Sequence, residues 1–262
     1  MKLTAEQVYD RLVNEDKILT LEGQIKFYLG DVNIVVKQKD VVGNIMQEWL
    51  EGWLKKNDVD YLPSDNPQMP PDFYLDPDNK TMHLLEVKAF NYRAAPGFDI
   101  ADFNAFQQGI IKEPHMLFAK YLIFGYDMST EGVVTVKKIW LKSLWEITRP
   151  MQNWSINLQV KRGTVQKIRP ATWYSQRGKF KTFNSLEDFL SAMEECVYTN
   201  PATHKDANEW KPKMLKSFKE AYEEDLIIPR WYEIKDNYIV KREKKKKTKP
   251  AKKVAKPKKV KK

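Results

Sequence analysis

Three side chains between residues 72 and 88 have the types and spacing needed to hold a hard cation and activate water on it. Asp72 opens a short apolar run, and Glu86 and Lys88 lie two residues apart in a second apolar run. Because side chains alternate across a β-strand, Glu86 and Lys88 share one face. Carboxylate oxygens are the ligands that Mg²⁺ prefers, and a nearby ammonium can assist the attacking water. The stretch therefore predicts a site that binds a hard cation and activates water on it.

The two apolar runs are separated by a turn, Asp76-Pro77-Asp78-Asn79-Lys80, whose residue types set or tolerate turn dihedrals. This pattern predicts a β-hairpin over residues 72–90 that brings Asp72 close to Glu86 and Lys88. The alternative is a surface hairpin that carries only a salt bridge from Lys88 to Glu86 or Asp72. The sequence LLEVKAF disfavours it, because a strand so apolar is buried and would not carry two charges without a use for them.

The Glu-x-Lys pattern alone has no weight, because it also occurs at Glu15, Glu209 and Glu233. None of these copies follows a Pro-Asp hairpin. The copy at Glu86 is also flanked by elements that can build a sheet around it. Residues 41–56 predict an amphipathic helix with an inward face, formed by Val42, Ile45, Met46, Trp49, Leu50, Trp53 and Leu54.

The chain after the hairpin predicts a return to the sheet. Asp99 is the expected cap of a helix over residues 100–111, and residues 119–126 form a continuous apolar run typical of a buried strand. A helix between two strands favours parallel pairing through a right-handed crossover. Residues 133–141 follow as a hairpin partner. The expected fold class is therefore α/β, with helices flanking a central mixed β-sheet.

Pro71-Asp72 followed by Glu86-x-Lys88 resembles the PD-(D/E)xK nuclease superfamily, which includes most type II restriction endonucleases. The resemblance implies a restriction-endonuclease-like core in which Asp72, Glu86 and the carbonyl of Val87 bind Mg²⁺, and Lys88 acts on the attacking water. It also implies that the preceding helix can lend a supporting side chain. Gln47 and Glu51 match that place, and a solvated helix face is the alternative for them.

Over most of its length the sequence also resembles the NgoBV-type restriction endonuclease family. The residues that carry this resemblance are LGDVNIVVKQKDVVGNIMQEWLEGWL, PDFYLD with LLEVKAFNYR, and VKRGTVQKIRPATW. It implies a type II enzyme that acts at the interrupted palindrome GGNNCC. A palindromic site implies a homodimer, so that each active site serves one strand.

Residues 160–181 interleave basic and aromatic side chains, a pattern suited to contacts with phosphates and bases. Arg162, Arg169 and Arg177 are the predicted DNA contacts, and a solvated sheet edge is the alternative. Arg93 follows the active strand and is expected to touch the scissile backbone. Ser175 and Gln176 are further candidates for contacts with bases.

The net charge of +10 comes from the C-terminal segment. Residues 241–262 hold 14 Lys or Arg and one acid, a net +13, so residues 1–240 carry 10 − 13 = −3. The overall basic charge therefore says nothing about a DNA surface in the body. We expect N-terminal elements and the catalytic core over 1–149, a part for DNA recognition over 150–238, and a disordered Lys-rich tail over 239–262.

Composition excludes several other classes of protein. The single Cys196 rules out an internal disulfide and a cysteine-based zinc site, and it favours a reducing, cytoplasmic location. The three histidines lack metal-ligand spacing, and there is no phosphate-binding loop, so no nucleotide cofactor is expected. No apolar run is long enough for a membrane helix.

The predicted function is that of a Mg²⁺-dependent type II deoxyribonuclease that cleaves double-stranded DNA at a specific site. Two alternatives remain at this stage. One is a repair nuclease or junction resolvase of the same fold, and the other is a DNA-binding protein without catalytic activity.

Overall fold

The structure of the protein is a computed structural model that describes residues 1–66, 69–175 and 177–241. Gln176 and residues 242–262 of the predicted tail lie outside the described residues. The expected tail boundary at residue 239 falls too early, because the amide of Val240 donates to the carbonyl of Lys179 at 2.9 Å and Ile239 pairs with Phe180. This backbone pairing makes residues 239–240 part of the folded body.

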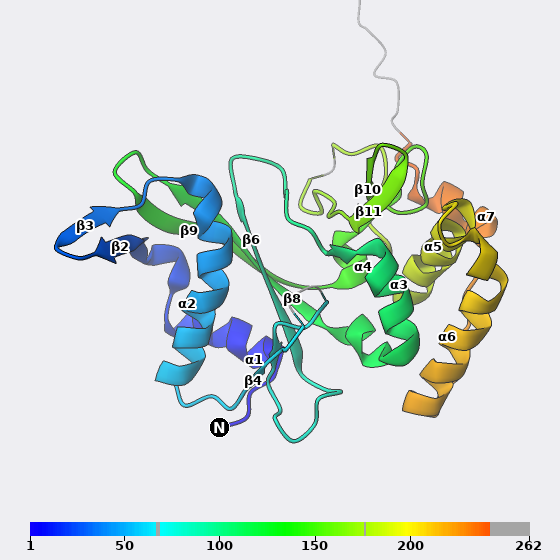
Figure 1. Cartoon of the computed structure of the whole chain (residues 1–262), viewed down its shortest axis with the longest axis horizontal. Coiled ribbons are helices and arrows are strands. Elements are labelled where there is room, and N and C mark those ends of the chain that lie inside the picture. Colours follow the sequence, from blue (N-terminus) through cyan, green and yellow to red (C-terminus); the bar gives the residue numbers. More distant parts are fainter. Residues whose placement is uncertain (67–68, 176, 242–262) are drawn as a thin grey trace, which may run out of the picture.

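A six-stranded mixed sheet forms the centre of the molecule, in the order β1-β9-β8-β6-β5-β4 (Figure 1). Strands β6 and β8 are parallel, as the sequence predicted, and all other neighbours are antiparallel. A helical crossover between β6 and β8 permits this pairing. The strands are β1 (Glu22–Gln24), β4 (Leu62–Pro63), β5 (Phe73–Tyr74), β6 (Leu84–Asn91), β8 (Lys120–Met128) and β9 (Val133–Ser143).

Helices cover both faces of the sheet, and each face has its own hydrophobic core. Helices α1 (Ala5–Asp10) and α2 (Val42–Lys56) pack on one face, against Leu85 and Val87 of β6. Phe90 of the same strand packs into the core on the opposite face. Since side chains alternate, Glu86 and Lys88 belong to the face of Phe90, away from α2. Figure 1 shows α2 and α3 on the two sides of β6 and β8.

The second core joins the sheet to the C-terminal half of the chain. Helices α3 (Phe103–Lys112), α5 (Leu186–Thr199) and α6 (Ala207–Tyr222) pack there, with Trp210 Nε1 donating to the carbonyl of Gln107 at 2.8 Å. Cys196 of α5 is fully buried, with its Sγ 3.0 Å from Ser155 Oγ. The remaining elements on this side are β7 (Ala101–Asp102), β10 (Leu158–Lys161), β11 (Thr164–Ile168), α4 (Leu144–Ile147) and α7 (Trp231–Ile234).

Most of the predicted elements are present, and two details of them were wrong. The prediction that Asp99 caps a helix from residue 100 fails, because residues 101–102 pair with β11 as a strand. Asp102 is the true cap, and its carboxylate accepts from the amide of Ala105 at 3.0 Å. On α2, Ile45 and Trp49 were expected to be buried, but each is 38% exposed, because they line a surface pocket rather than the core.

No helix among the described residues combines the length and the apolar composition that a membrane span requires. The largest hydrophobic residues are distributed over the two cores on either side of the sheet.

The capping role of Asp102 predicts a measurable loss of stability. Asp102→Ala removes the acceptor for the amide of Ala105, and we expect the free energy of unfolding to fall by about 1 kcal/mol. Asp102→Asn keeps a side-chain oxygen in the same place and is expected to retain most of that stability. Urea denaturation of the two variants and the parent chain checks this, and equal losses in both variants would contradict the capping role.

Candidate active site

The hairpin of β5 and β6 places Asp72 beside Glu86 and Lys88 of β6. The register pairs Phe73 with Leu85, and the amide of Asp72 donates to the carbonyl of Leu85 at 3.0 Å. The carboxylate of Asp72 then reaches across β6, where Oδ2 accepts from the amide of Val87 at 2.7 Å. The predicted hairpin is thus present, and it fixes the Asp72 carboxylate by a backbone hydrogen bond next to Glu86 and Lys88.

Glu86 and Lys88 form a buried ion pair on the same face of β6. Lys88 Nζ lies 2.6 Å from Glu86 Oε1, with side-chain exposures of 21% and 5%. The second oxygen, Glu86 Oε2, is buried and has no hydrogen-bond partner. A buried carboxylate oxygen without a partner is costly, and in native proteins such an atom marks an absent ion or water or a functional group.

Burial and mutual charge shift all three side chains from their ordinary pKa values. Burial raises the pKa of Glu86 to about 7, opposed by the positive charge of Lys88 and reinforced by the negative charge of Asp72. Burial likewise raises the pKa of Asp72, although Lys88 and the Val87 amide oppose it. Burial lowers the pKa of Lys88, but attraction to Glu86 and Asp72 outweighs it and the net shift is upward. Two carboxylates share one ammonium, so the site carries excess negative charge.

This donor set fits a divalent cation. Asp72 and Glu86 provide carboxylate oxygens, and the oxygen of Glu86 without a partner is the natural ligand atom. The described residues contain no cluster of three or more His, Cys, Asp or Glu side chains arranged for a metal. A cation held by two carboxylates keeps its remaining positions for water and substrate, as Mg²⁺ sites in phosphate chemistry commonly do.

Tyr121 is a candidate site residue that the sequence analysis missed. It lies on β8 directly beside Glu86 in the parallel register, and its side chain is fully buried. Its hydroxyl has no hydrogen-bond partner, and burial together with the charges of Glu86 and Asp72 raises the pKa of the phenol well above its ordinary value. The only sequence signal was a hydroxyl within the apolar run AKYLIFGY, which reads equally well as core.

The loop after β6 is held close to Lys88 by an ion pair between Asp99 and Arg169. Arg169 also donates from Nη2 to the carbonyl of Gly97 at 2.6 Å. The negative charge of Asp99 contributes to the raised pKa of Lys88. Arg169 was predicted to contact DNA, and here its guanidinium joins β11 to the loop over residues 92–99.

The other predicted DNA contacts have different surroundings. Arg93 donates from Nε to Asp127 Oδ2 at 2.9 Å, although its side chain is 73% exposed. Arg162 is exposed at the turn between β10 and β11, where its φ is 52°. The amide of Arg177 donates to Ser175 Oγ at 3.3 Å, in a loop whose Trp173 and Tyr174 form an aromatic cluster with Phe90 and Trp140. Through Phe90, the cluster anchors this loop at the end of β6.

The two supporting residues proposed on α2 form no hydrogen bond or ion pair with the three charged side chains among the described residues. Glu51 accepts from Tyr61 Oη at 2.8 Å and pairs with Lys55 at 2.7 Å. Gln47 is half-buried and makes no hydrogen bond to Asp72, Glu86 or Lys88 in the part of the chain that the structure describes. Helix α2 packs on the opposite face of β6, which separates it from the ion pair.

The fold and the site together define a class of protein, the restriction endonucleases. The structure superimposes on the solved NlaIV restriction endonuclease with a TM-score of 0.88 and 55% sequence identity, covering 91% of this chain and 98% of the other. The family model described as NgoBV restriction endonuclease matches residues 2–238, and the chain belongs to that family.

Two relatives support this assignment. The type II restriction enzyme NlaIV of Neisseria lactamica is 56% identical over 239 residues, which is 91% of this chain and 98% of that protein. The type II restriction enzyme NgoBV of Neisseria gonorrhoeae is 52% identical over 162 residues, which is 62% of this chain and 92% of that protein. The predicted family, fold class and type II endonuclease function are confirmed. Enzymes of this class act on DNA and generally need a divalent metal ion. Neither the repair nuclease nor the inert DNA-binding protein gains support.

The different surroundings of the arginines predict different effects of removing them. Arg169→Ala loses the ion pair to Asp99 and the hydrogen bond to Gly97, and we expect the free energy of unfolding to fall by about 1–2 kcal/mol. Arg162→Ala removes a side chain at an exposed turn and is expected to change stability by less than about 0.5 kcal/mol. Urea denaturation measures both values. Equal effects would show that the Asp99 pair does not hold the loop.

Proposed function

We propose that Asp72, Glu86 and Lys88 are the catalytic residues of a Mg²⁺-dependent type II restriction endonuclease that hydrolyses phosphodiester bonds of double-stranded DNA. The observation that carries this proposal is that a hairpin brings two carboxylates and an ammonium together, with Glu86 buried and its Oε2 without a hydrogen-bond partner among the described residues. The family to which the chain belongs supports the same chemistry.

Each residue has a role that follows from its position. Asp72 and Glu86, with the carbonyl of Val87, would hold the Mg²⁺. When bound, Mg²⁺ lowers the pKa of water and neutralises charge that develops on phosphorus. Lys88 is held by Glu86 at 2.6 Å, so its ammonium is positioned to orient the attacking water and to stabilise developing negative charge. Tyr121 lies beside Glu86 and is suited to position that carboxylate through a bridging water.

DNA recognition is assigned to the part of the chain over residues 150–238, together with Arg93. Arg162 lies in the turn between β10 and β11, and Arg177 lies in the loop that contains Ser175. Arg169 is a third predicted contact, and its hydrogen bond to Gly97 also joins this part of the chain to the loop after β6. Guanidinium groups can pair with guanine in two hydrogen bonds, which suits a G- and C-containing site such as GGNNCC. That sequence rests on the resemblance to the family.

A palindromic target is matched by a two-fold symmetric enzyme, so we propose that the active form is a homodimer. Each protomer would then cleave one strand. We also propose that the enzyme acts in the cytoplasm, and the free, buried Cys196 agrees with such a reducing compartment.

Cleavage of plasmid DNA tests the catalytic assignment. With Mg²⁺ and a plasmid that contains GGNNCC sites, the parent chain is expected to give discrete fragments. Asp72→Ala and Lys88→Ala are each expected to lower the cleavage rate by at least about 1,000-fold, because they remove a metal ligand or the charged group at the attacking water. Gel electrophoresis over time measures the rates.

The control for this experiment is Lys80→Ala in the turn of the same hairpin, where the side chain is exposed and its Nζ lies 5.6 Å from the centroid of the Tyr74 ring. It is expected to cut at the parental rate. Binding of DNA by the two inactive variants, measured in Ca²⁺, should survive. Mg²⁺-dependent cutting by purified Asp72→Ala or Lys88→Ala protein would refute the assignment, and a smear in place of discrete fragments would refute site-specific cleavage.

Thermal unfolding with Ca²⁺, used as a metal that binds without supporting cleavage, tests the metal ligands without measuring activity. A ligand that binds only the folded state at about 100 times its Kd stabilises by about 2.7 kcal/mol, so the Tm of the parent chain should rise by several degrees. Glu86→Gln is expected to lose that rise, because the carboxylate charge at Oε2 is gone. Glu51→Gln is the matched variant on α2. If Ca²⁺ still raises the Tm of Glu51→Gln, Glu51 is not a metal ligand. If Ca²⁺ still raises the Tm of Glu86→Gln, the assignment of Glu86 as a metal ligand is wrong.

A further inference from the structure

The hairpin of β2 (Lys26–Leu29) and β3 (Val32–Val35) presents an apolar face to solvent. The register pairs Phe27 with Ile34 and Leu29 with Val32, and cross-strand partners share a face. Phe27, Ile34, Leu29 and Val32 are 54%, 53%, 73% and 65% exposed. In Figure 1 this hairpin projects from the edge of the molecule, at the opposite end from α5, α6 and α7.

This exposure is unusual for a hairpin that must hold its shape. The two strands form a sheet of their own and pair with no third strand among the described residues. An isolated two-stranded hairpin is marginally stable in water, and a contiguous exposed apolar face marks an interaction site. The four residues belong to neither hydrophobic core. No described residue of the same chain brings this face into a hydrophobic core, so a partner is needed to cover it.

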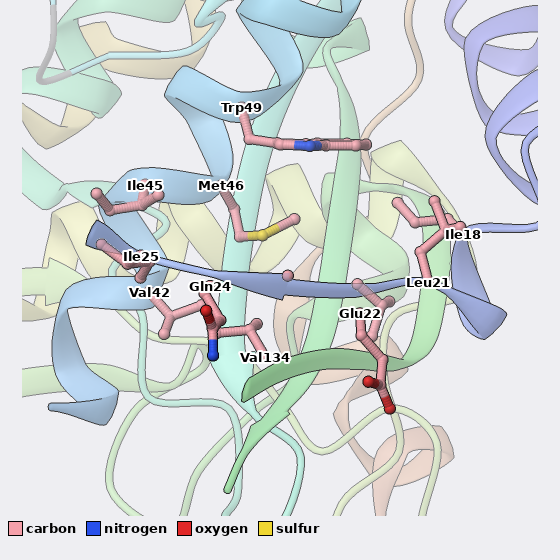
Figure 2. Close-up of a pocket in the computed structure, with 12 residues that line it drawn as sticks. Ile18, Leu21, Glu22, Gln24, Ile25, Val42, Ile45, Met46, Trp49 and Val134 are labelled. Carbon is pink, nitrogen blue, oxygen red and sulfur yellow. The ribbon is translucent and has the colours of Figure 1, made fainter. Parts of the chain in front are cut away.

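An apolar pocket of about 190 Å³ lies at the base of the hairpin. Figure 2 shows Ile25, Ile45, Trp49 and Leu21 around it, together with Met46 and Val134. Ile25 directly precedes β2 and lies two residues before Phe27, so it continues the hairpin face into the pocket. Leu21 is 48% exposed, and Ile45 and Trp49 are 38% exposed each. The projecting hairpin and the hollow thus form one continuous apolar surface.

We propose that this surface is where two copies of the chain meet across a two-fold axis. The occupant is a second copy, because the surface holds both a projection and a hollow. A two-fold interface brings the same patch of each copy together. The hairpin of each copy can therefore fill the pocket of the other copy. The inference rests on the homodimer of the proposed function and adds the surface that forms it.

The area and the chemistry of the surface agree with a protein partner. The exposed surfaces of seven of its residues, backbone and polar atoms included, amount to roughly 700–800 Å², which compares with the approximately 800 Å² per partner of a standard interface. The residues are Leu21, Phe27, Leu29, Val32, Ile34, Ile45 and Trp49. DNA is a poor occupant of this face, since its four side chains carry no positive charge for phosphates and the exposed Lys26, which pairs with Val35, belongs to the other face. Glu86 and Lys88 belong to the face of β6 away from α2, so a dimer made here does not cover that face of the strand.

Sedimentation equilibrium of the full chain tests the proposal. The parent chain is expected to be a dimer at micromolar concentration. The double variant Leu29→Ser with Val32→Ser is expected to raise the dissociation constant of the dimer at least about 100-fold, because it places hydroxyls at the centre of the interface. The matched control is Tyr28→Ser, which changes a residue that is 65% exposed on the other face of the hairpin and should leave the dimer intact.

Hydrogen exchange of the parent chain gives a second measurement that needs no variant. Amides of residues 25–36 are expected to be more protected at high protein concentration than at low concentration. A parent dimer that persists in the double variant, or shows no such protection, would overturn this surface and leave the homodimer standing. A parent chain that is monomeric at all concentrations would overturn both, while the plasmid experiment judges the nuclease assignment separately.

Discussion

The hydrogen bond from the amide of Val87 to the carboxylate of Asp72, at 2.7 Å, ties the fold to the chemistry. It joins the start of β5 to the middle of β6, so the geometry of the site is set by the backbone of a hairpin rather than by flexible side chains. Burial then makes each charge depend on the others. Lys88 is retained in its charged form by Glu86 and Asp72, and the two carboxylates repel each other, which prepares the site for a cation.

The rest of the molecule keeps this charged group rigid and partly shielded. Parallel pairing with β8 places β6 inside the sheet, and a hydrophobic core lies on each face. The ion pair between Asp99 and Arg169 holds the loop beyond β6, and the ring of Phe90 packs on Tyr174 in the loop after β11. A strand held from so many directions has little freedom to separate Glu86 from Lys88.

The sequence was sufficient where local pattern and burial agree. The hairpin, α2 and the parallel strand β8 follow from turn residues, from a 3.6-residue period and from a continuous apolar run. It was insufficient where distant residues decide the outcome. Asp99 was predicted to cap a helix, but residues 101–102 pair with β11 as a strand, so the helix begins later. Ile45 and Trp49 recur with the period of core residues, but they line a surface pocket. Local period shows which face of a helix is apolar, but not what covers it.

The same distinction applies to the site. Asp72, Glu86 and Lys88 could be proposed as site residues because their spacing within 17 positions is visible in the sequence. Tyr121 lies beside Glu86 only through the pairing of β6 with β8, and Arg169 reaches Asp99 over 70 positions. A local sequence pattern cannot show which residues distant in the sequence lie next to each other in the fold. The arginines were selected as DNA contacts from their charge and their place in the sequence, and neither shows the acidic partners that Arg93 and Arg169 have in the folded chain.

The surroundings of Cys196 make this protein convenient for spectroscopy. Its thiol is fully buried against Ser155, and burial raises its pKa to about 12, so almost no reactive thiolate exists near neutral pH. Because it is the single cysteine of the chain, a cysteine introduced on the surface becomes the one site that a maleimide dye or spin label modifies in the folded protein. Distances between labels can therefore be measured without first removing the native thiol from the packed core of α5.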